Sequence, residues 1–355
     1  MIKFIKLTLV GVWLLTACQG QPKQLAPQNT LRPTFQPTVA LLIKPSPQPP
    51  LPTATIKPSP TLRPVEENGK IALKHLQSLA GKIGARSPGT PQETDAAEYI
   101  QKTFEELGFS TEVQPFTFKD DDEGQMSSQN VVAGKPGLSN KTLIVGAHYD
   151  SGDEAKGADD NASGAAVMLE AAELISKIET PYTIIFIAFG AEENDLDGSS
   201  YYVEQMSSSA VKNSIVMINL DSLVAGNLAY VYGDAGPDTL RDWILDMATK
   251  SGIKLEGKTA ADLNNDDGSL CECSDYDAFQ QENIPFVYFE ATDWSLGEND
   301  GMTQVDPNFG DEGEIRHTKF DTIETINQLF PDRIEQKLNL FVTLLVNTLT
   351  DFKLP

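Results

Sequence analysis

Six side chains able to bind metal ions or transfer protons stand close to the ends of apolar segments of this chain. They are two histidines and four acids: His148, Asp160, Glu192, Glu193, Asp221 and His317. The chain has three histidines in all, so two of them belong to this set. Imidazole nitrogens and carboxylate oxygens together suit a pair of first-row divalent ions, with zinc the first choice. A carboxylate shared by two such ions would hold them about 3.5–4 Å apart, the separation found in two-metal hydrolases.

The neighbouring carboxylates of Glu192 and Glu193 can divide the work of such a site. One can bind a metal ion while the other stays free to accept a proton from the attacking water. Any one of the six residues, taken alone, has an ordinary structural explanation, because polar residues are common at strand ends. Six of them at six such positions are hard to explain by chance. We therefore interpret the set as a catalytic metal site.

The first part of this site comes from one continuous stretch of chain. The apolar run 143–145 is bounded by turn residues and predicts a strand that leads to His148 and Asp150. After a loop, Asp160 stands just before an apolar segment, 165–175, which predicts a helix. In an open α/β sheet, ligands bind at the carboxyl ends of the strands. These three polar side chains are therefore expected on one edge of the sheet.

Two later strands bring further acids to the same edge. The run 183–189 is apolar throughout, which suits a strand buried on both faces, and the adjacent glutamates follow it closely. The apolar run 214–220 ends at Asp221. The second histidine of the set comes after an acidic, glycine-rich loop over 293–314.

The remaining segments alternate between the two kinds of element. We expect further helices over 71–83, 94–107, 199–206, 237–251, 275–282 and 331–352, and further strands over 111–118, 130–133, 228–232 and 285–290. A polar loop is expected over 120–128. Alternating strands and helices predict an α/β fold of three layers, α/β/α, around a mixed and mostly parallel central sheet. The third histidine, His75, falls within the first helix, where packing explains it better than function.

The net charge of the chain excludes some classes of binding partner. Its 355 residues include 51 acidic and 27 basic ones, a net charge of -24. A phosphate backbone would be repelled by this charge, so we expect no nucleic-acid partner. Adhesion to an anionic membrane through charge alone is disfavoured for the same reason. Acidity suits a protein exposed outside the cell, and a site for divalent cations needs carboxylates.

The N-terminus has the features of an export signal. Lys3 and Lys6 precede a short apolar run, 7–15, and small residues follow. The letters LTAC, which end at Cys18, resemble the lipobox of bacterial lipoproteins. That resemblance implies that residues 1–17 are removed and that lipid on Cys18 anchors an extracytoplasmic protein to a membrane. The alternative is an ordinary signal, or a short anchor helix, with an incidental cysteine.

A linker is expected between the lipid and the folded domain. Residues 18–64 are rich in proline, threonine and glutamine, a composition that stays extended and builds no core. A proline-rich recognition segment is the alternative for this stretch. The folded domain is expected over 65–355. It holds Cys271 and Cys273, which could form a disulfide in an oxidising compartment, although one intervening residue makes a tight ring.

Five motifs in this order resemble those of the M28 family of zinc peptidases, the aminopeptidase Y and bacterial leucyl aminopeptidase group. They are HYDS at 148–151, GADDNASG at 157–164, FGAEE at 189–193, NLDS at 219–222 and RHTKFDT at 316–322. The resemblance covers residues 71–352. It implies a zinc exopeptidase fold and two zinc ions that act on peptide substrates. It also implies that the peptide bond after the second aspartate of GADDNASG is cis.

The resemblance also implies a role for each site residue. His148 and Asp221 would hold one zinc ion, Glu193 and His317 the other, and Asp160 would bridge the two.

Outside the ligands, Glu192 would be the general base. Asp150 would orient His148 through a hydrogen bond, and Asp321 would do the same near His317. In family members with a cysteine-bracketed loop, a tyrosine within the loop helps to polarise the substrate carbonyl. This chain has no tyrosine between its two cysteines. Tyr276 follows them, and we do not assign it that role.

The function expected from all this is a secreted, lipid-anchored aminopeptidase, which we expect to be monomeric. A glutaminyl cyclase of similar fold, an acyltransferase with one zinc, is the alternative from another class, and it would predict a defective first metal site. A carboxypeptidase of the same fold also remains open, because the pocket residues that recognise an amine or a carboxylate cannot be placed. An inert binding relative is disfavoured by the complete ligand set.

Overall fold

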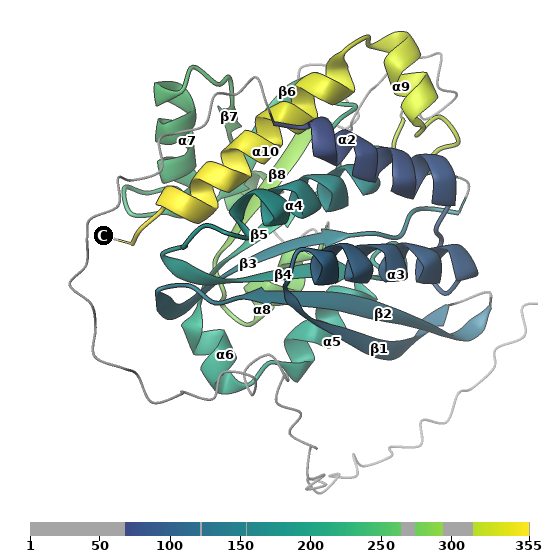
Figure 1. The fold of residues 1–355 in the computed structure, drawn as a ribbon, viewed down its shortest axis with the longest axis horizontal. Helices are drawn as coiled ribbons and strands as arrows, with labels where there is room; N and C mark the ends of the chain where they lie inside the picture. The colour runs from purple at the N-terminus through teal and green to yellow at the C-terminus, as the bar shows by residue number, and fades with distance from the viewer. Residues whose placement is uncertain (1–67, 121–122, 154, 264–273, 294–314, 355) are drawn as a thin grey trace, which may run out of the picture. The chain divides into compact units, whose positions relative to one another are not determined.

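The computed structural model of the chain describes residues 68–120, 123–153, 155–263, 274–293 and 315–354, and Figure 1 shows their fold. The expected signal peptide and linker lie outside the described residues, and so do Cys18, Cys271 and Cys273. Within the described part, no helix combines the length and the apolar character that crossing a membrane requires.

An eight-stranded sheet forms the middle layer, with the strand order β1-β2-β4-β3-β5-β8-β6-β7. The strands are β1 (Ser110–Asp120), β2 (Gly124–Lys135), β3 (Ser139–His148), β4 (Tyr182–Phe189), β5 (Ser214–Leu220), β6 (Leu228–Gly233), β7 (Glu256–Gly257) and β8 (Phe286–Thr292). The four central strands, β4, β3, β5 and β8, run parallel to one another. β2 and β6 are antiparallel to the neighbours that join them to this centre. The prediction of a mixed, mostly parallel sheet is confirmed.

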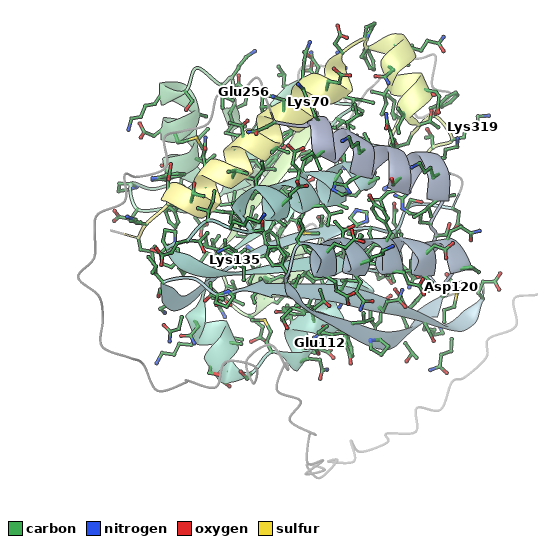
Figure 2. The ribbon with its side chains drawn as sticks, in the orientation of Figure 1. Lys70, Glu112, Asp120, Lys135, Glu256 and Lys319 are labelled. Atoms are coloured by element: carbon green, nitrogen blue, oxygen red, sulfur yellow. The ribbon has the colours of Figure 1, made fainter. Side chains whose placement is uncertain are left out.

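Helices cover both faces of the sheet, so the fold has the three layers expected (Figure 1). One face carries α2 (Lys70–Leu76), the π-helical turn η2 (Gln77–Ile83), α3 (Pro91–Glu106), α4 (Ala162–Ile175), α7 (Leu240–Lys250), α9 (Ile323–Leu329) and α10 (Arg333–Asp351). The other carries α5 (Asp197–Gln205), α6 (Ser208–Asn213), the 3-10 turn η3 (Ala260–Leu263) and α8 (Tyr276–Gln281). The charged side chains of Lys70, Glu256 and Lys319, which Figure 2 labels, are exposed.

The sequence of β4 explains why this strand lies in the centre. Its side chains alternate between the two cores: Phe186 and Ala188 pack on one face, and Ile187 and Phe189 on the other. All four are fully buried. Each large apolar side chain buried in this way contributes about 1.5–3 kcal/mol to folding. The continuous apolar run therefore forms a strand covered on both sides, as predicted.

The start of α4 packs unusually close to the end of β5. A Cβ atom on Gly164 would lie 2.3 Å from the carbonyl oxygen of Leu220, so only glycine permits this approach. Asn161 secures the same contact: its side chain donates to the Leu220 carbonyl at 2.8 Å and accepts the Gly164 N–H at 2.8 Å. The helix start is thereby fixed beside the residue that follows β5.

The structure corrects several expected boundaries. β2 starts at Gly124, so the expected polar loop over 120–128 is largely strand, paired with β1 from Asp120 onward. Antiparallel pairing depends on backbone hydrogen bonds, and polar side chains at a sheet margin do not prevent it. The helix expected from 94 starts at Pro91, because Thr90 caps it by accepting the Glu93 N–H at 3.3 Å.

Candidate metal centre

The site lies at the carboxyl edge of the central strands. β3 ends at His148, and its two neighbours in the sheet are β4 and β5. β4 ends three residues before Glu192, and β5 ends directly before Asp221. Because parallel neighbouring strands end at the same edge of the sheet, the side chains of His148, Glu192 and Asp221 come together close to the strand ends.

The ring of His148 is surrounded by acids. Its Nε2 lies 3.1 Å from Asp160 Oδ1, 3.5 Å from Asp221 Oδ1 and 3.8 Å from Glu192 Oε2. On the opposite side of the ring, Nδ1 lies 3.4 Å from Asp150 Oδ1. His148, Asp150 and Asp160 come from one stretch of chain, and Glu192 and Asp221 come from two later segments that the sequence predicted to converge with it.

A second group forms around His317. Its Nε2 lies 3.0 Å from Asp160 Oδ2 and 3.4 Å from Glu193 Oε2. Asp160 therefore presents one carboxylate oxygen to each histidine. Ligand atoms of Asp160, Glu193 and His317 lie within 4.8 Å of one another, and the same holds for His148, Glu192 and Asp221. The structure thus brings all six predicted residues together in two adjacent groups.

The donor set fits divalent cations. Within the part of the chain that the structure describes, both ring nitrogens of His148 and Oε1 of Glu193 are buried without a hydrogen-bond partner. Buried polar atoms normally have partners, and exceptions call for an explanation such as an ion. Nitrogen and oxygen donors in this number are what zinc takes from proteins.

Proton affinities in the site follow from burial and crowding. Burial raises the pKa of Glu192 well above its usual range, and the nearby charge of Asp275 raises it further. Burial also raises the pKa of Glu193 to about 8. Burial opposes ionisation of Asp160 as well, but the two imidazoles that face its oxygens prevail and hold its pKa well below the usual range. Among the protein groups alone, the carboxylate between the histidines is therefore the one that stays charged most readily.

Asp150 is fully buried and contacts both parts of the site. Besides its approach to His148, its Oδ2 accepts the backbone N–H of Glu193 at 3.1 Å. The prediction placed Asp150 beside His148 only, and the link to Glu193 could not be read from the sequence.

Asp321 has a different place from the one expected. Its carboxylate accepts the backbone N–H groups of Asp159 and Asp160, at 2.7 Å and 3.0 Å. It therefore holds the backbone of the aspartate between the histidines, where the prediction had it orient the ring of His317. The Asp160–Asn161 peptide bond is cis, as the family resemblance implied.

Two buried residues that the sequence did not single out support Asp221. Ser274 donates its hydroxyl to Asp221 Oδ2 at 2.7 Å, and Asn219 donates to Ser274 Oγ at 2.8 Å. Tyr276, which follows, is buried and stacks on Phe286 with ring centroids 4.2 Å apart. Its ring belongs to the core.

Arg86 is another residue that sequence reasoning missed. It is fully buried, and its guanidinium donates to the carbonyls of Tyr149, Lys156 and Gly157 at 2.7, 2.7 and 3.1 Å. These carbonyls belong to the loop that leads from His148 to Asp160. The only signal in the sequence is a basic residue inside a turn-rich segment, which is a weak one.

The loop that carries His317 is attached through its neighbour. Arg316 Nη1 lies 3.6 Å from Glu290 Oε1, and Tyr232 donates its hydroxyl to Glu290 Oε2 at 2.8 Å. His317 itself has a φ of 60°, in the left-handed region. Its backbone therefore depends on contacts of this kind to keep an unfavourable conformation.

Comparison with known proteins places this arrangement among peptidases. The alkaline phosphatase isozyme conversion protein of Escherichia coli is 29% identical over 298 residues, which cover 76% of this chain and 86% of that protein. The probable lipoprotein aminopeptidase LpqL of Mycobacterium tuberculosis is 29% identical over 276 residues, 71% of this chain and 51% of that protein.

Solved structures share the fold. A zinc aminopeptidase from Bacillus subtilis superposes with a TM-score of 0.65 at 20% identity, over 82% of this chain and 98% of that one. The glutaminyl cyclase of Porphyromonas gingivalis has a TM-score of 0.59 at 18% identity, over 79% and 97%.

The family model described as peptidase family M28 matches residues 130–342. This match includes all six residues of the two groups and confirms the resemblance seen in the motifs. The chain therefore belongs to peptidase family M28, a family of enzymes that hydrolyse peptide bonds.

Proposed function

We propose that this protein is a di-zinc aminopeptidase. The observation that carries the proposal is the carboxylate of Asp160, which presents one oxygen to each of two histidines. Each histidine has a further acid within 3.5 Å, Asp221 beside His148 and Glu193 beside His317. This supports one zinc ion on each side of a shared aspartate. The printed names of the relatives, among them aminopeptidases and a zinc aminopeptidase, point the same way.

Glu192 remains as the general base. It also lies within reach of the His148 group, so it could instead be a third ligand there. Asp160 lies closer to His148 Nε2, at 3.1 Å against 3.8 Å, and supplies the carboxylate that Glu192 would otherwise provide. Burial raises the proton affinity of Glu192, which suits a group that must take up a proton near neutral pH.

Zinc bound here would acidify a water molecule and stabilise negative charge that develops on the substrate carbonyl. Glu192 accepts the proton of the attacking water and afterwards delivers it to the leaving amine. Asp150 keeps the ring of His148 in place and holds the backbone at Glu193, so the base and the neighbouring ligand keep their relative positions.

Several buried carboxylates favour a substrate with a free amine over one with a free carboxylate. Beside the six site residues stand the fully buried Asp150 and Asp275 and the buried Glu290. A carboxypeptidase would need a cation to receive the substrate's carboxylate. Arg316, adjacent to His317 in the chain, is paired with Glu290. The site therefore fits an α-ammonium group better.

A glutaminyl cyclase is the second candidate, since one such enzyme shares the fold. That reading predicts a defective first metal site. With Asp160 counted on both sides and Glu192 left as the base, each side still has a histidine and two acids: Asp160 and Asp221 beside His148, and Asp160 and Glu193 beside His317. This feature speaks for the two-metal peptidase.

The deciding experiment uses the purified full chain. Zinc content is measured together with cleavage of free and N-acetylated aminoacyl-p-nitroanilides, with and without chelator. Two zinc ions per chain and chelator-sensitive cleavage of only the free-amine substrates support the aminopeptidase. One zinc ion, no cleavage and cyclisation of N-terminal glutamine peptides would replace it by the cyclase.

We also propose that the mature protein is held to a bacterial membrane by lipid on Cys18. The support is the lipobox-like LTAC sequence and the proline-rich stretch behind it. A Cys18→Ser variant expressed in a bacterium should move from the membrane fraction to the soluble fraction. An unchanged distribution would contradict lipid anchoring.

A further inference from the structure

The loop that follows β4 is held at three nearly successive residues by buried side chains from three other elements. The N–H of Gly190 donates to Asn130 Oδ1 at 3.3 Å, and the N–H of Ala191 donates to Glu93 Oε1 at 3.2 Å. The N–H of Glu193 donates to Asp150, as described above. Among these side chains, Glu93 holds the residue directly before Glu192.

Glu93 lies in the first turn of α3 and is only 1% exposed. Its two carboxylate oxygens have separate partners. Oε2 accepts the backbone N–H of Gly89 at 2.7 Å, at the start of the helix. Oε1 accepts the Ala191 N–H and a short hydrogen bond from the Ser128 hydroxyl. Oε2 therefore stabilises the start of α3, and Oε1 holds the loop of the active site.

The loop has a shape that needs such support. Ala191 has a φ of 53°, in the left-handed region, which is unfavourable for a residue other than glycine. A Cβ atom on Gly190 would lie 2.3 Å from Ser128 Oγ and 2.8 Å from Glu93 Oε1. The backbone thus passes closer to Glu93 and Ser128 than any side chain would allow. These contacts determine the direction in which the chain leaves toward Glu192.

Burying an acid is costly unless its hydrogen bonds are satisfied. Burial raises the pKa of Glu93 to about 8, while its three hydrogen bonds act in the opposite direction. A residue that served only to cap α3 would need neither this depth nor the contact with β2 and the loop.

We propose that Glu93 is a positioning residue of the active site: its Oε1 holds Ala191 and thereby sets the places of Glu192 and Glu193. The proposal rests on the function proposed above, in which these two acids are the base and a zinc ligand. Glu93 itself belongs to neither of the two groups of possible metal ligands.

Two substitutions separate the roles of the two oxygens. In Glu93→Gln, the amide oxygen can take the place of Oε1 and accept from Ala191 and Ser128, while the amide nitrogen faces the Gly89 N–H and loses that bond. In Glu93→Ala, both roles are lost. The Gln variant should therefore be less stable but keep most of the activity. The Ala variant should lose about 10- to 100-fold in kcat and in zinc affinity, with little change in KM.

Glu170 provides a matched control. It is also a buried glutamate, 2% exposed, and it accepts three backbone N–H groups, those of Gly69, Ile71 and Ala72, at 2.9, 3.1 and 2.6 Å. These bonds support the start of α2 and touch no residue of the site. Glu170→Ala should therefore lower the Tm without changing kcat or zinc affinity, when assayed well below the Tm.

Hydrogen exchange gives a reading that needs neither zinc nor a substrate. The amides of Ala191 and Glu193 should exchange faster in Glu93→Ala than in the wild type, and should be unchanged in Glu170→Ala and nearly so in Glu93→Gln. If the wild type cleaves no aminoacyl substrate, the proposed function fails, and the exchange rates still decide whether Glu93 holds the loop.

Three results would overturn the positioning role. The first is a Glu93→Ala variant with wild-type kcat, zinc affinity and exchange at Ala191. The second is an equal loss in Glu170→Ala, which would mean that lower stability alone explains the effect. The third is a Glu93→Gln variant as impaired as the Ala variant, which would mean that the charge matters and the acceptor geometry does not.

Discussion

His148 and His317 face the two oxygens of the same aspartate, yet the protein holds them in different ways. His148 ends a central strand, and its side chain is 1% exposed. His317 lies on a loop with a left-handed backbone, and its side chain is 55% exposed. Lys319, two residues further on, lies at the periphery of the molecule (Figure 2).

This difference separates a part of the site fixed by the sheet from a part fixed by contacts of a loop. The sheet positions His148 through the same hydrogen bonds and apolar packing that build the core. The loop of His317 is held by the Arg316–Glu290 pair and by hydrogen bonds within the loop, such as the one from the Thr318 N–H to the Ile315 carbonyl at 3.2 Å. We therefore expect the His148 side to be the more rigid and the tighter zinc site, and the His317 side to exchange its ion more readily.

The sharpest test of the comparison removes each histidine in turn. His148→Ala and His317→Ala should each lose essentially all activity, and each should retain about one zinc ion of the two. Only His148→Ala should also lower the Tm markedly, because it empties a fully buried position among several acids. Metal analysis and thermal unfolding check this. Equal changes in Tm would show that the two sides are not held differently.

Substituting Glu192 should show whether this residue acts in the chemical step or in metal binding. Glu192→Gln removes the proton acceptor and should lower kcat by about 10²–10⁴-fold while both zinc ions remain. Glu193→Gln is the matched control, because it should lose zinc from the His317 side. Steady-state kinetics and zinc content distinguish the two. Loss of zinc in Glu192→Gln would reassign this glutamate as a ligand of the His148 side.

Asp150 should matter less than the ligands, since it acts through His148 and Glu193. Asp150→Asn should lower zinc affinity or activity by about 10- to 100-fold. The loss of affinity should fall on the His148 side first, because the carboxylate faces that ring at 3.4 Å. Titration with a competing chelator measures this. A loss confined to the more weakly bound ion would contradict it.

The third histidine, His75, shows how burial away from the site changes a pKa and the pH dependence of stability. Burial lowers the pKa of His75 to about 4, and its Nδ1 lies 2.7 Å from the Tyr99 hydroxyl. In the unfolded chain His75 takes up a proton below about pH 6.5. Between pH 6.5 and 4 the unfolded state then binds more protons, so the free energy of unfolding falls as the pH falls, by on the order of 3 kcal/mol.

Replacing this histidine should therefore reduce the pH dependence of the free energy of unfolding below pH 6.5, without changing catalysis. His75→Gln should lose less free energy of unfolding than the wild type between pH 6.5 and 4, with unchanged kcat and zinc content. Urea unfolding at several pH values provides the measurement. An identical pH dependence in both proteins would show that His75 is not the group responsible.

Strand ends could be predicted from the sequence because a run of neighbouring apolar residues marks where a buried strand begins and ends. Apolar runs give the strands, and parallel neighbours end on one edge, so His148, Asp221 and the two glutamates were expected together. The residues that support the site, such as Glu93 and Asp321, make their contacts with residues far away in the chain, and no pattern of neighbouring residues marks them. Glu93 is 98 residues from Ala191 in the chain, and Asp321 is 161 residues from Asp160.

Only the folded backbone brings such pairs together, and a buried glutamate and a surface glutamate look alike in a sequence. The Thr90–Glu93 spacing is typical of a helix start, but we expected this helix to begin at residue 94, and such a spacing gives no hint of the loop after β4. The short helices α6 and α9 were not predicted; with six and seven residues they show little helical periodicity, although the equally short α8 was expected.

The contact between Gly164 and Leu220 bears on metal selectivity. Asp160 precedes α4 and Asp221 follows β5, so the distance between the proposed shared ligand and a proposed ligand of one ion is set by how closely that helix and strand approach. A single missing methyl group at residue 164 sets this approach. In the proposed two-zinc site, the separation of these two ligands is thus fixed by the backbone, and attempts to fit larger ions should alter the glycine before any of the ligands.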